Sequence, residues 1–138
     1  MKKSKVNHLE TMRDTNKCAL ITASSKGLGK AIAQTFSENG YDIILHGRDI
    51  NKVEKTKKLL EKNNVKVHPL VGDLRDSNFL TQLSKVSENK VSVLVNNAAI
   101  PCYGLTLNDM KYEQIAESLN TNLISPILLT QKIYSLFK

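Results

Sequence analysis

Short apolar runs alternate along this chain with longer segments in which apolar residues recur every three or four positions. Short, unbroken runs rich in β-branched residues are typical of strands that are buried on both faces of a sheet. By this criterion we expect strands over residues 17–23, 42–47, 65–71 and 91–97. The clearest of these runs are Ile43-Ile44-Leu45 and Val93-Leu94-Val95.

The segments between the expected strands have the periodicity of amphipathic helices. Leu28, Ile32 and Phe36 lie four apart in the first helix, which ends at Asn39-Gly40. The apolar positions of the next two helices are Ile50, Val53 and Leu60, and Phe79, Leu83 and Val86. A long final helix is expected from Asn108-Asp109, with apolar positions at Ile115, Leu119, Leu123 and Ile127. The simplest interpretation of each apolar stripe is that it faces the core.

The alternation of strands and helices indicates the fold class. It predicts an α/β fold with a doubly wound parallel sheet of the Rossmann type, right-handed crossovers and helices on both faces. The chain has 138 residues, which is enough for one domain with a substantial core. We place this domain at residues 17–138. Residues 1–16 are polar and lack periodicity, so we expect a flexible tail in which Met12 could be an alternative start.

Cysteine content and hydropathy bear on the cellular compartment. Cys18 and Cys102 are too few for a disulfide framework, and we expect both to be reduced. No run approaches the ~18 consecutive apolar residues of a membrane span. Lys2, Lys3 and Lys5 are not followed by the apolar segment of a signal peptide. These observations favour the cytoplasm and no contact with a membrane.

The formal net charge of +7 allows two interpretations. A basic surface can bind nucleic acid, or it can suit a small anionic ligand. The lysines of residues 52–62 lie on helix-like faces without aromatic residues between them, so we expect no nucleic-acid partner. His8, His46 and His68 lack the spacing of metal ligands, and we expect no metal site.

The segment from Thr22 to Gly29 joins the first strand to the first helix and carries the most specific chemistry. A turn of small residues that opens a helix brings unpaired N–H groups and the positive end of the helix dipole to one place. Small residues let the backbone approach a ligand, and a glycine near the helix start lets helix and strand pack closely. The segment therefore predicts a phosphate or pyrophosphate site.

Three motifs, in order, resemble those of the short-chain dehydrogenase/reductase family. Thr22 to Gly29 is similar to the family's Thr-Gly-x-x-x-Gly-x-Gly, with Ala23 in place of the first glycine. Asn96-Asn97-Ala98-Ala99 is similar to Asn-Asn-Ala-Gly, and Gly72-Asp73-Leu74 supplies an Asp that in this family meets the adenine amine. The cofactor-binding residues that the resemblance implies are Thr22, Ser24, Ser25, Lys26, Gly27, Leu28, Gly29, Arg48, Asp73, Leu74, Asn96 and Ala98.

The residues after the second strand bear on the choice of cofactor. Folds that prefer NAD place an acid there to bind the ribose 2′-hydroxyl. Here the position is Gly47, followed by Arg48, which could hold a 2′-phosphate by two hydrogen bonds. Lys26 would lie on the same side of the site. We therefore favour NADP(H) over NAD(H), against the alternative that Arg48 is a loop residue paired with Asp49.

Two positions in the last segment resemble catalytic residues of the family. Asn122 matches the active-site Asn, whose main-chain carbonyl holds a relay water. Pro126 has no N–H, so this carbonyl lacks its helical donor; the alternative is a simple kink with a polar residue in the helix. Tyr134 and Lys138 have the spacing of the catalytic Tyr-x-x-x-Lys. They follow Asn122 in the same helix, with no strand for the catalytic Ser between, so we assign them no catalytic role.

The resemblance implies that residues 17–138 are an incomplete dinucleotide-binding Rossmann domain, the first half of an oxidoreductase. We expect an NADP(H)-dependent enzyme of a carbonyl or alcohol substrate, truncated before its catalytic Ser and Tyr-x-x-x-Lys and inactive alone, with the substrate undetermined. The alternatives are a non-catalytic NADP(H)-binding or regulatory module and, less favoured, a nucleic-acid-binding protein. The family orders its strands 3-2-1-4-5-6-7, so the fourth strand would be an open edge. We expect the chain to aggregate, to form homo-oligomers or to pair with a chain that supplies the second half.

Overall fold

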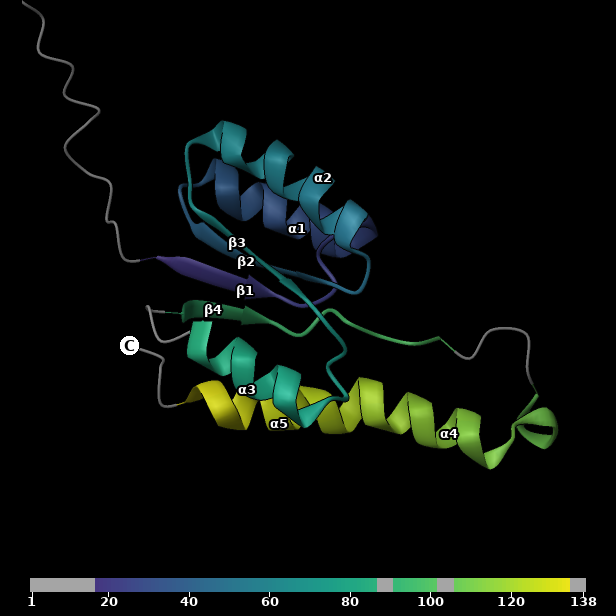
Figure 1. Cartoon of the computed structure of the whole chain (residues 1–138). Coiled ribbons are helices and arrows are strands. Elements are labelled where there is room, and N and C mark those ends of the chain that lie inside the picture. Colours follow the sequence, from purple (N-terminus) through teal and green to yellow (C-terminus); the bar gives the residue numbers. More distant parts are fainter. Residues whose placement is uncertain (1–16, 87–90, 102–105, 135–138) are drawn as a thin grey trace, which may run out of the picture.

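The computed structural model describes residues 17–86, 91–101 and 106–134. These residues form a parallel four-stranded sheet with helices on both faces (Figure 1). The strands are β1 (Cys18–Ile21), β2 (Asp42–Gly47), β3 (Val67–Val71) and β4 (Val91–Val95), in the order β3-β2-β1-β4. The predicted fold class and strand order are confirmed, with β4 at an edge. The predicted tail, residues 1–16, lies outside the described residues.

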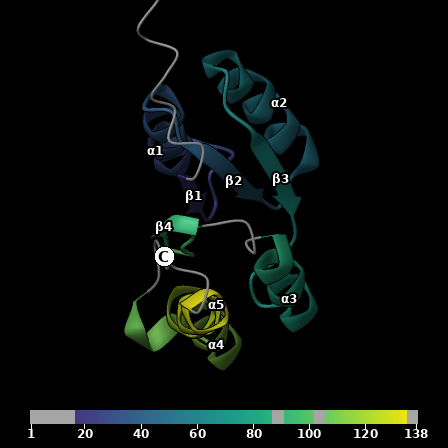
Figure 2. The ribbon, with the colours of Figure 1, turned by 90° about the vertical axis from the view of Figure 1, so that its left-hand side faces the viewer.

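The helices lie in two layers, one on each side of the sheet (Figures 1 and 2). One layer holds α1 (Gly27–Glu38) and α2 (Ile50–Leu60). The other holds α3 (Ser77–Val86), α4 (Tyr112–Leu119) and α5 (Ser125–Ile133). A π-helical turn, Asn120–Ile124, joins α4 to α5, and short 3-10 turns lie at Glu61–Asn63 and Leu107–Asp109.

The core has two parts, one on each face of the sheet. Successive residues of the central strands β1 and β2 point to opposite faces, which explains why both runs are apolar without interruption. The layer under α1 and α2 includes Ala19, Ile21, Ile43, Leu45, Val53 and Leu60. The layer under α3 and α5 includes Leu20, Ile44, Phe79, Leu83, Leu129 and Ile133.

Not all of the predicted apolar stripes face the core. In α1 the side chain of Leu28 is 71% exposed, while Ile32 and Phe36 pack against the core from its side. The stripe of the last segment, Ile115, Leu119, Leu123 and Ile127, is exposed as well. The buried positions there are Thr121, Ser125, Leu129 and Ile133. Periodicity identifies an apolar face but not its partner, and among the described residues none covers this outer face.

The final helix also begins later than predicted. Asp109 belongs to a 3-10 turn and accepts a hydrogen bond from the hydroxyl of Thr106 at 2.5 Å. Helix α4 begins at Tyr112, where the side chain of Gln114 accepts from the N–H of Lys111 at 2.9 Å. Asp109 therefore stabilises a local turn instead of capping the helix, a competition that short polar side chains commonly offer.

Candidate functional site

A pocket of about 510 Å³ lies at the carboxyl ends of the strands, where ligands bind in open parallel sheets. The structure brings six of the predicted cofactor residues to its wall: Ser25, Lys26, Arg48, Asp73, Leu74 and Ala98. Other predicted residues are not part of the wall: Thr22, Ser24, Gly27, Leu28, Gly29, Asn96 and Asn122. Residues of the wall that the sequence did not indicate include His46, Lys52, Ile100, Glu117 and Thr121.

The turn between β1 and α1 has the backbone geometry of a tight ligand cradle. Ala23 and Gly27 have φ values of 50° and 53°, in the left-handed region. Helix α1 starts without a side-chain cap at Lys26, so the N–H groups of its first turn can meet an anion. A Cβ at Gly29 would lie 2.4 Å from the carbonyl oxygen of Ala23, so only glycine lets the helix start approach the turn this closely.

His46, at the end of β2, anchors this turn. Its Nδ1 accepts a hydrogen bond from the N–H of Ala23 at 3.0 Å, so its Nε2 carries the proton and donates to the carbonyl of Gly72 at 3.1 Å. The ring is buried, and this burial lowers its pKa. His46 is therefore neutral and joins the turn to the loop after β3. The sequence showed only an isolated histidine near a strand.

Two hydroxyl groups hold the same turn from inside the fold. Ser24 is fully buried and donates to the carbonyl of Ile21 at 2.8 Å, so its side chain is used internally. Thr56 of α2 donates to the carbonyl of Ser25 at 3.0 Å. The spacing of apolar residues in α2 gave no sign of this contact, because Thr56 is a buried polar residue on that helix.

The first and last sequence motifs form one hydrogen-bonded unit. The buried hydroxyl of Thr22 accepts from the N–H groups of Asn97 and Ala98, both at 2.9 Å. The side-chain amide of Asn97 donates to the carbonyls of Thr22 and Ala23, at 3.0 and 3.2 Å. The end of β4 is thereby fixed against the turn after β1. Asn96 points elsewhere, toward Thr130 of α5, at 3.4 Å.

Basic side chains line the β2 side of the pocket. Asp49 caps α2 by accepting from the N–H of Asn51 at 3.0 Å, and it pairs with Lys52 at 3.4 Å. The alternative of an Arg48–Asp49 pair is thus not what the structure has. Within the described residues, exposed Arg48 and Lys26 have no ion-pair partner.

Gly47 leaves no room for an acidic side chain at the end of β2. A Cβ at this position would lie 2.7 Å from Oγ of Ser25 and 2.7 Å from a methyl group of Val53. Any side chain there would displace either the β1–α1 turn or α2. The sequence has Gly47 where folds that prefer NAD have an acid, and the close packing around this glycine explains why no acidic side chain fits there.

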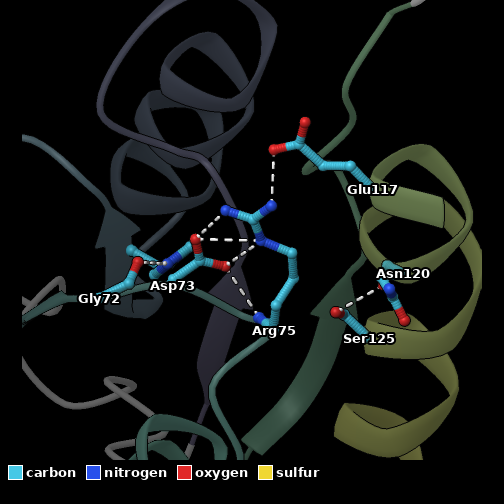
Figure 3. A network of polar contacts seen from close by, with 7 residues as sticks. Gly72, Asp73, Arg75, Glu117, Asn120 and Ser125 are labelled. Atoms are coloured by element: carbon cyan, nitrogen blue, oxygen red, sulfur yellow. Dashed lines mark hydrogen bonds and ion pairs between the residues drawn. The ribbon is translucent and has the colours of Figure 1, made fainter. Parts of the chain in front are cut away.

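Asn122 lies in the π-helical turn, and its side chain forms hydrogen bonds with the main chain of the segment after β4. Its Oδ1 accepts from the N–H of Ile100 at 2.8 Å, and its Nδ2 donates to the carbonyl of Ile100 at 2.9 Å. The turn itself is supported by the hydroxyl of Ser125, which donates to the carbonyl of Asn120 at 2.7 Å (Figure 3). The water-holding role of the Asn122 carbonyl stays a prediction.

Tyr134 is placed outside the pocket. It follows α5, its side chain is 75% exposed, and it is not a lining residue. Lys138 and Cys102 lie outside the described residues. Among the residues with a described placement, no group of three or more His, Cys, Asp or Glu could hold a metal ion. In that same part of the chain, none of the helices has the length and apolar character needed to cross a bilayer.

Two residues of the pocket wall, Asp73 and Glu117, belong to one ion-pair network (Figure 3). The guanidinium of Arg75 pairs with Asp73 at 2.6 Å and with Glu117 of α4 at 2.6 Å. Hydrogen bonds from Arg75 lower the pKa of Asp73 to about 2. Asp73 and Glu117 line the pocket, whereas Arg75, which lies between them, is not a lining residue. The sequence indicated Asp73 alone of these three.

Comparison with known proteins identifies the family. The short chain dehydrogenase family model matches residues 17–138. The chain belongs to the short-chain dehydrogenase family. An uncharacterized oxidoreductase of Bacillus subtilis, YhdF, is 33% identical over 120 residues, which cover 84% of this chain and 42% of the relative. A farnesol dehydrogenase of Aedes aegypti is 32% identical over 130 residues, covering 91% and 53%. This short-chain dehydrogenase chain thus spans about half the length of the curated relatives it matches.

Solved structures show the same fold. L-sorbose reductase from Gluconobacter frateurii, complexed with NADPH and L-sorbose, superposes with a TM-score of 0.82 at 23% identity, covering 87% of this chain and 47% of that one. A metagenomic short-chain oxidoreductase in complex with NADP has a TM-score of 0.81 at 24% identity, covering 88% and 56%. This short-chain dehydrogenase chain therefore shares the fold of proteins that hold NADP(H).

Proposed function

We propose that this chain is the NADP(H)-binding half of a short-chain oxidoreductase that acts on a carbonyl or alcohol substrate. The observation that carries the proposal is the β2 side of the pocket. Two cations without ion-pair partners among the described residues, Lys26 and Arg48, meet there beside a glycine that excludes an acid. The solved structures with bound NADP(H) and the same fold support it.

The residues around the pocket fit such a ligand. The uncapped start of α1 offers N–H groups to the pyrophosphate, and Gly29 lets this helix start lie close to the turn after β1. Arg48 can hold a 2′-phosphate by two hydrogen bonds, with Lys26 as a second positive charge. Asp73 can accept a hydrogen bond from the adenine amine. When bound, NADP(H) supplies or accepts the hydride.

The groups that complete proton transfer are proposed to come from sequence outside this chain. Tyr134 is exposed and lies away from the pocket, so it is not placed to protonate a carbonyl oxygen there. The exposed side chains of Leu123 and Ile127 and the edge strand β4 would pack against such a segment. It would be either a continuation of the chain or a separate polypeptide. We also propose that the protein is located in the cytoplasm.

Substitution of the two cations tests the assignment. Reduced-nicotinamide fluorescence is followed while NADPH or NADH is titrated into the wild type, Lys26→Ala, Arg48→Ala and Lys58→Ala. Lys58 is exposed on α2 and does not line the pocket, so it controls for the loss of one positive charge. We expect Arg48→Ala and Lys26→Ala each to weaken NADPH binding by roughly tenfold and to leave NADH binding unchanged. Lys58→Ala should bind both cofactors as the wild type does. Equal NADPH affinities in all four proteins would remove the basis for the cofactor assignment.

A further inference from the structure

The carboxylate of Asp73 is gripped from one side by Arg75, two residues further along the chain. Nη2 of Arg75 donates to Oδ2 at 2.6 Å, and Nε lies 3.0 Å from Oδ1 and 3.1 Å from Oδ2. The main-chain N–H of Arg75 also donates to Oδ1, at 2.9 Å. A two-point pairing of this kind fixes the orientation of the carboxylate as well as its distance.

Arg75 is itself held from the opposite side. Its Nη1 donates to Oε1 of Glu117 at 2.6 Å, and Figure 3 shows the guanidinium lying between the two carboxylates. Glu117 belongs to α4, so the contact ties the loop after β3 to a helix far along the sequence. Arg75 cannot turn away from Asp73 without also giving up Glu117.

This arrangement leaves limited hydrogen-bonding capacity on Asp73. A carboxylate offers about four acceptor positions. Three N–H groups of Arg75 make four contacts with the carboxylate, because the single Nε proton is shared between Oδ1 and Oδ2. These three protons occupy about three acceptor positions, which leaves about one. Asp73 lines the pocket and Arg75 does not, so a ligand would meet the carboxylate and not the guanidinium.

We propose that Arg75 is a positioning residue for the base of the cofactor, and that it makes the site selective for a purine with an amino group at C6. It presents Asp73 as an ionised carboxylate with one acceptor position free. An amino group at C6 can donate to that position, whereas a carbonyl oxygen at C6 would face a negative charge. The proposal rests on the NADP(H) binding proposed above.

The ion-pair network of Asp73, Arg75 and Glu117 orients the Asp73 carboxylate and adds little to the free energy of unfolding. The side chains of Asp73, Arg75 and Glu117 are 36%, 35% and 46% exposed, and ion pairs this exposed add little to stability. Variants at Arg75 should therefore fold, and their effect should appear in the choice between ligands. A merely structural role would change the affinities for both purines alike.

The test compares NADPH with its deamino analogue, in which hypoxanthine replaces adenine. Dissociation constants for both are measured by nicotinamide fluorescence in the full chain and in Arg75→Met, Arg75→Lys, Asp73→Asn and Lys85→Met. Met keeps an unbranched apolar stem like that of Arg without its donors, and Lys keeps the charge without the planar fork of N–H donors. Lys85→Met removes one exposed positive charge from α3, outside the pocket.

We expect the wild type and Lys85→Met to prefer NADPH by roughly tenfold. Arg75→Met, Arg75→Lys and Asp73→Asn should all lose most of this preference. The two Arg75 variants should lose it by weaker binding of NADPH, whereas Asp73→Asn should also bind the deamino analogue more tightly, because the Asn amide can donate to the C6 carbonyl. If Arg75→Met keeps the wild-type preference, or if the wild type binds both ligands equally, the inference is overturned while NADP(H) binding stands. If the wild type binds neither ligand, the proposed function and the inference both fall.

Discussion

Nδ1 of His46 accepts the N–H of Ala23, a residue whose φ of 50° lies in the left-handed region, at 3.0 Å. One buried ring thus holds Ala23, in the turn between β1 and α1, in an unfavourable backbone conformation. The same ring donates to the carbonyl of Gly72, one residue before Asp73. The phosphate end and the adenine end of the proposed site are therefore set by one side chain.

Protonation of His46 should destabilise the fold. Burial lowers the pKa of His46 from its ordinary value of 6.5, so below that pH the unfolded chain binds the proton more readily than the folded chain. The contribution of neutral His46 to the free energy of unfolding is fully present above about pH 6.5 and is lost as the pH drops toward the lowered pKa. We expect the midpoint temperature of thermal unfolding of the wild type to decrease as the pH is lowered from 7.5 to 5.

The control variants separate His46 from other titrating groups. His46→Gln cannot be protonated and should lose this part of the pH dependence. His68→Gln, at an exposed position on β3, should keep it. Equal slopes of midpoint against pH in the wild type and His46→Gln would contradict the assigned role.

Ala23→Gly should stabilise the protein. The left-handed conformation costs an L-residue with a Cβ roughly 1–2 kcal/mol, part of which is returned by the greater freedom of glycine in the unfolded chain. We expect a net gain of about 1 kcal/mol in the free energy of unfolding, measured by urea titration. Ala33→Gly, inside α1, should lose about 1 kcal/mol or more. A loss in both variants would show that the turn carries no such strain.

Gly47→Asp should not produce an NADH-binding protein. The new side chain would collide with Ser25 and Val53, so we expect a lower melting temperature and weaker binding of both cofactors. Arg48→Asp places an acid at the adjacent exposed position without a collision. It should lower NADPH affinity at nearly unchanged stability, measured by calorimetry and fluorescence titration. A stable Gly47→Asp variant that gains NADH affinity would refute the packing argument.

The isolated chain should self-associate through its exposed apolar face. Leu123 and Ile127 are 53% and 58% exposed, and β4 is an edge strand. We expect Leu123→Lys and Ile127→Lys to reduce light scattering without a large change in stability. Leu129→Lys, at a buried position of α5, should unfold the chain. A sharp, reversible melt of a monomeric wild type would count against this expectation.

The sequence predicted the sheet better than the helices around it. Apolar runs such as Ile43-Ile44-Leu45 stand out because strands buried on both faces need no polar positions. Helix α4 begins at Tyr112 and not at Asn108-Asp109, because Thr106 and Asp109 form their own turn. The apolar stripe through Leu123 predicted a helix correctly. It could not show that the buried face would instead be the one that carries Leu129 and Ile133.

The candidate site was predicted from its motifs but not from the contacts that fix them. Ser25, Lys26, Arg48 and Asp73 line the pocket as the turn and strand ends indicated. His46, Thr56 and Arg75 carry no motif, and they act through side chains that meet only in the folded chain. His46 lies 26 residues from Gly72 and Arg75 lies 42 residues from Glu117 in the sequence. Such partners follow from the strand order and not from local spacing.

The preference between the two nicotinamide cofactors tests the central claim most directly. NADPH and NADH are titrated separately into the wild-type chain at equal ionic strength, and the two dissociation constants are compared. Because the proposed site places Lys26 and Arg48 against a 2′-phosphate, which only NADPH carries, we predict that NADPH binds more tightly by roughly tenfold or more. Equal affinities, tighter binding of NADH, or binding of neither cofactor would contradict the claim.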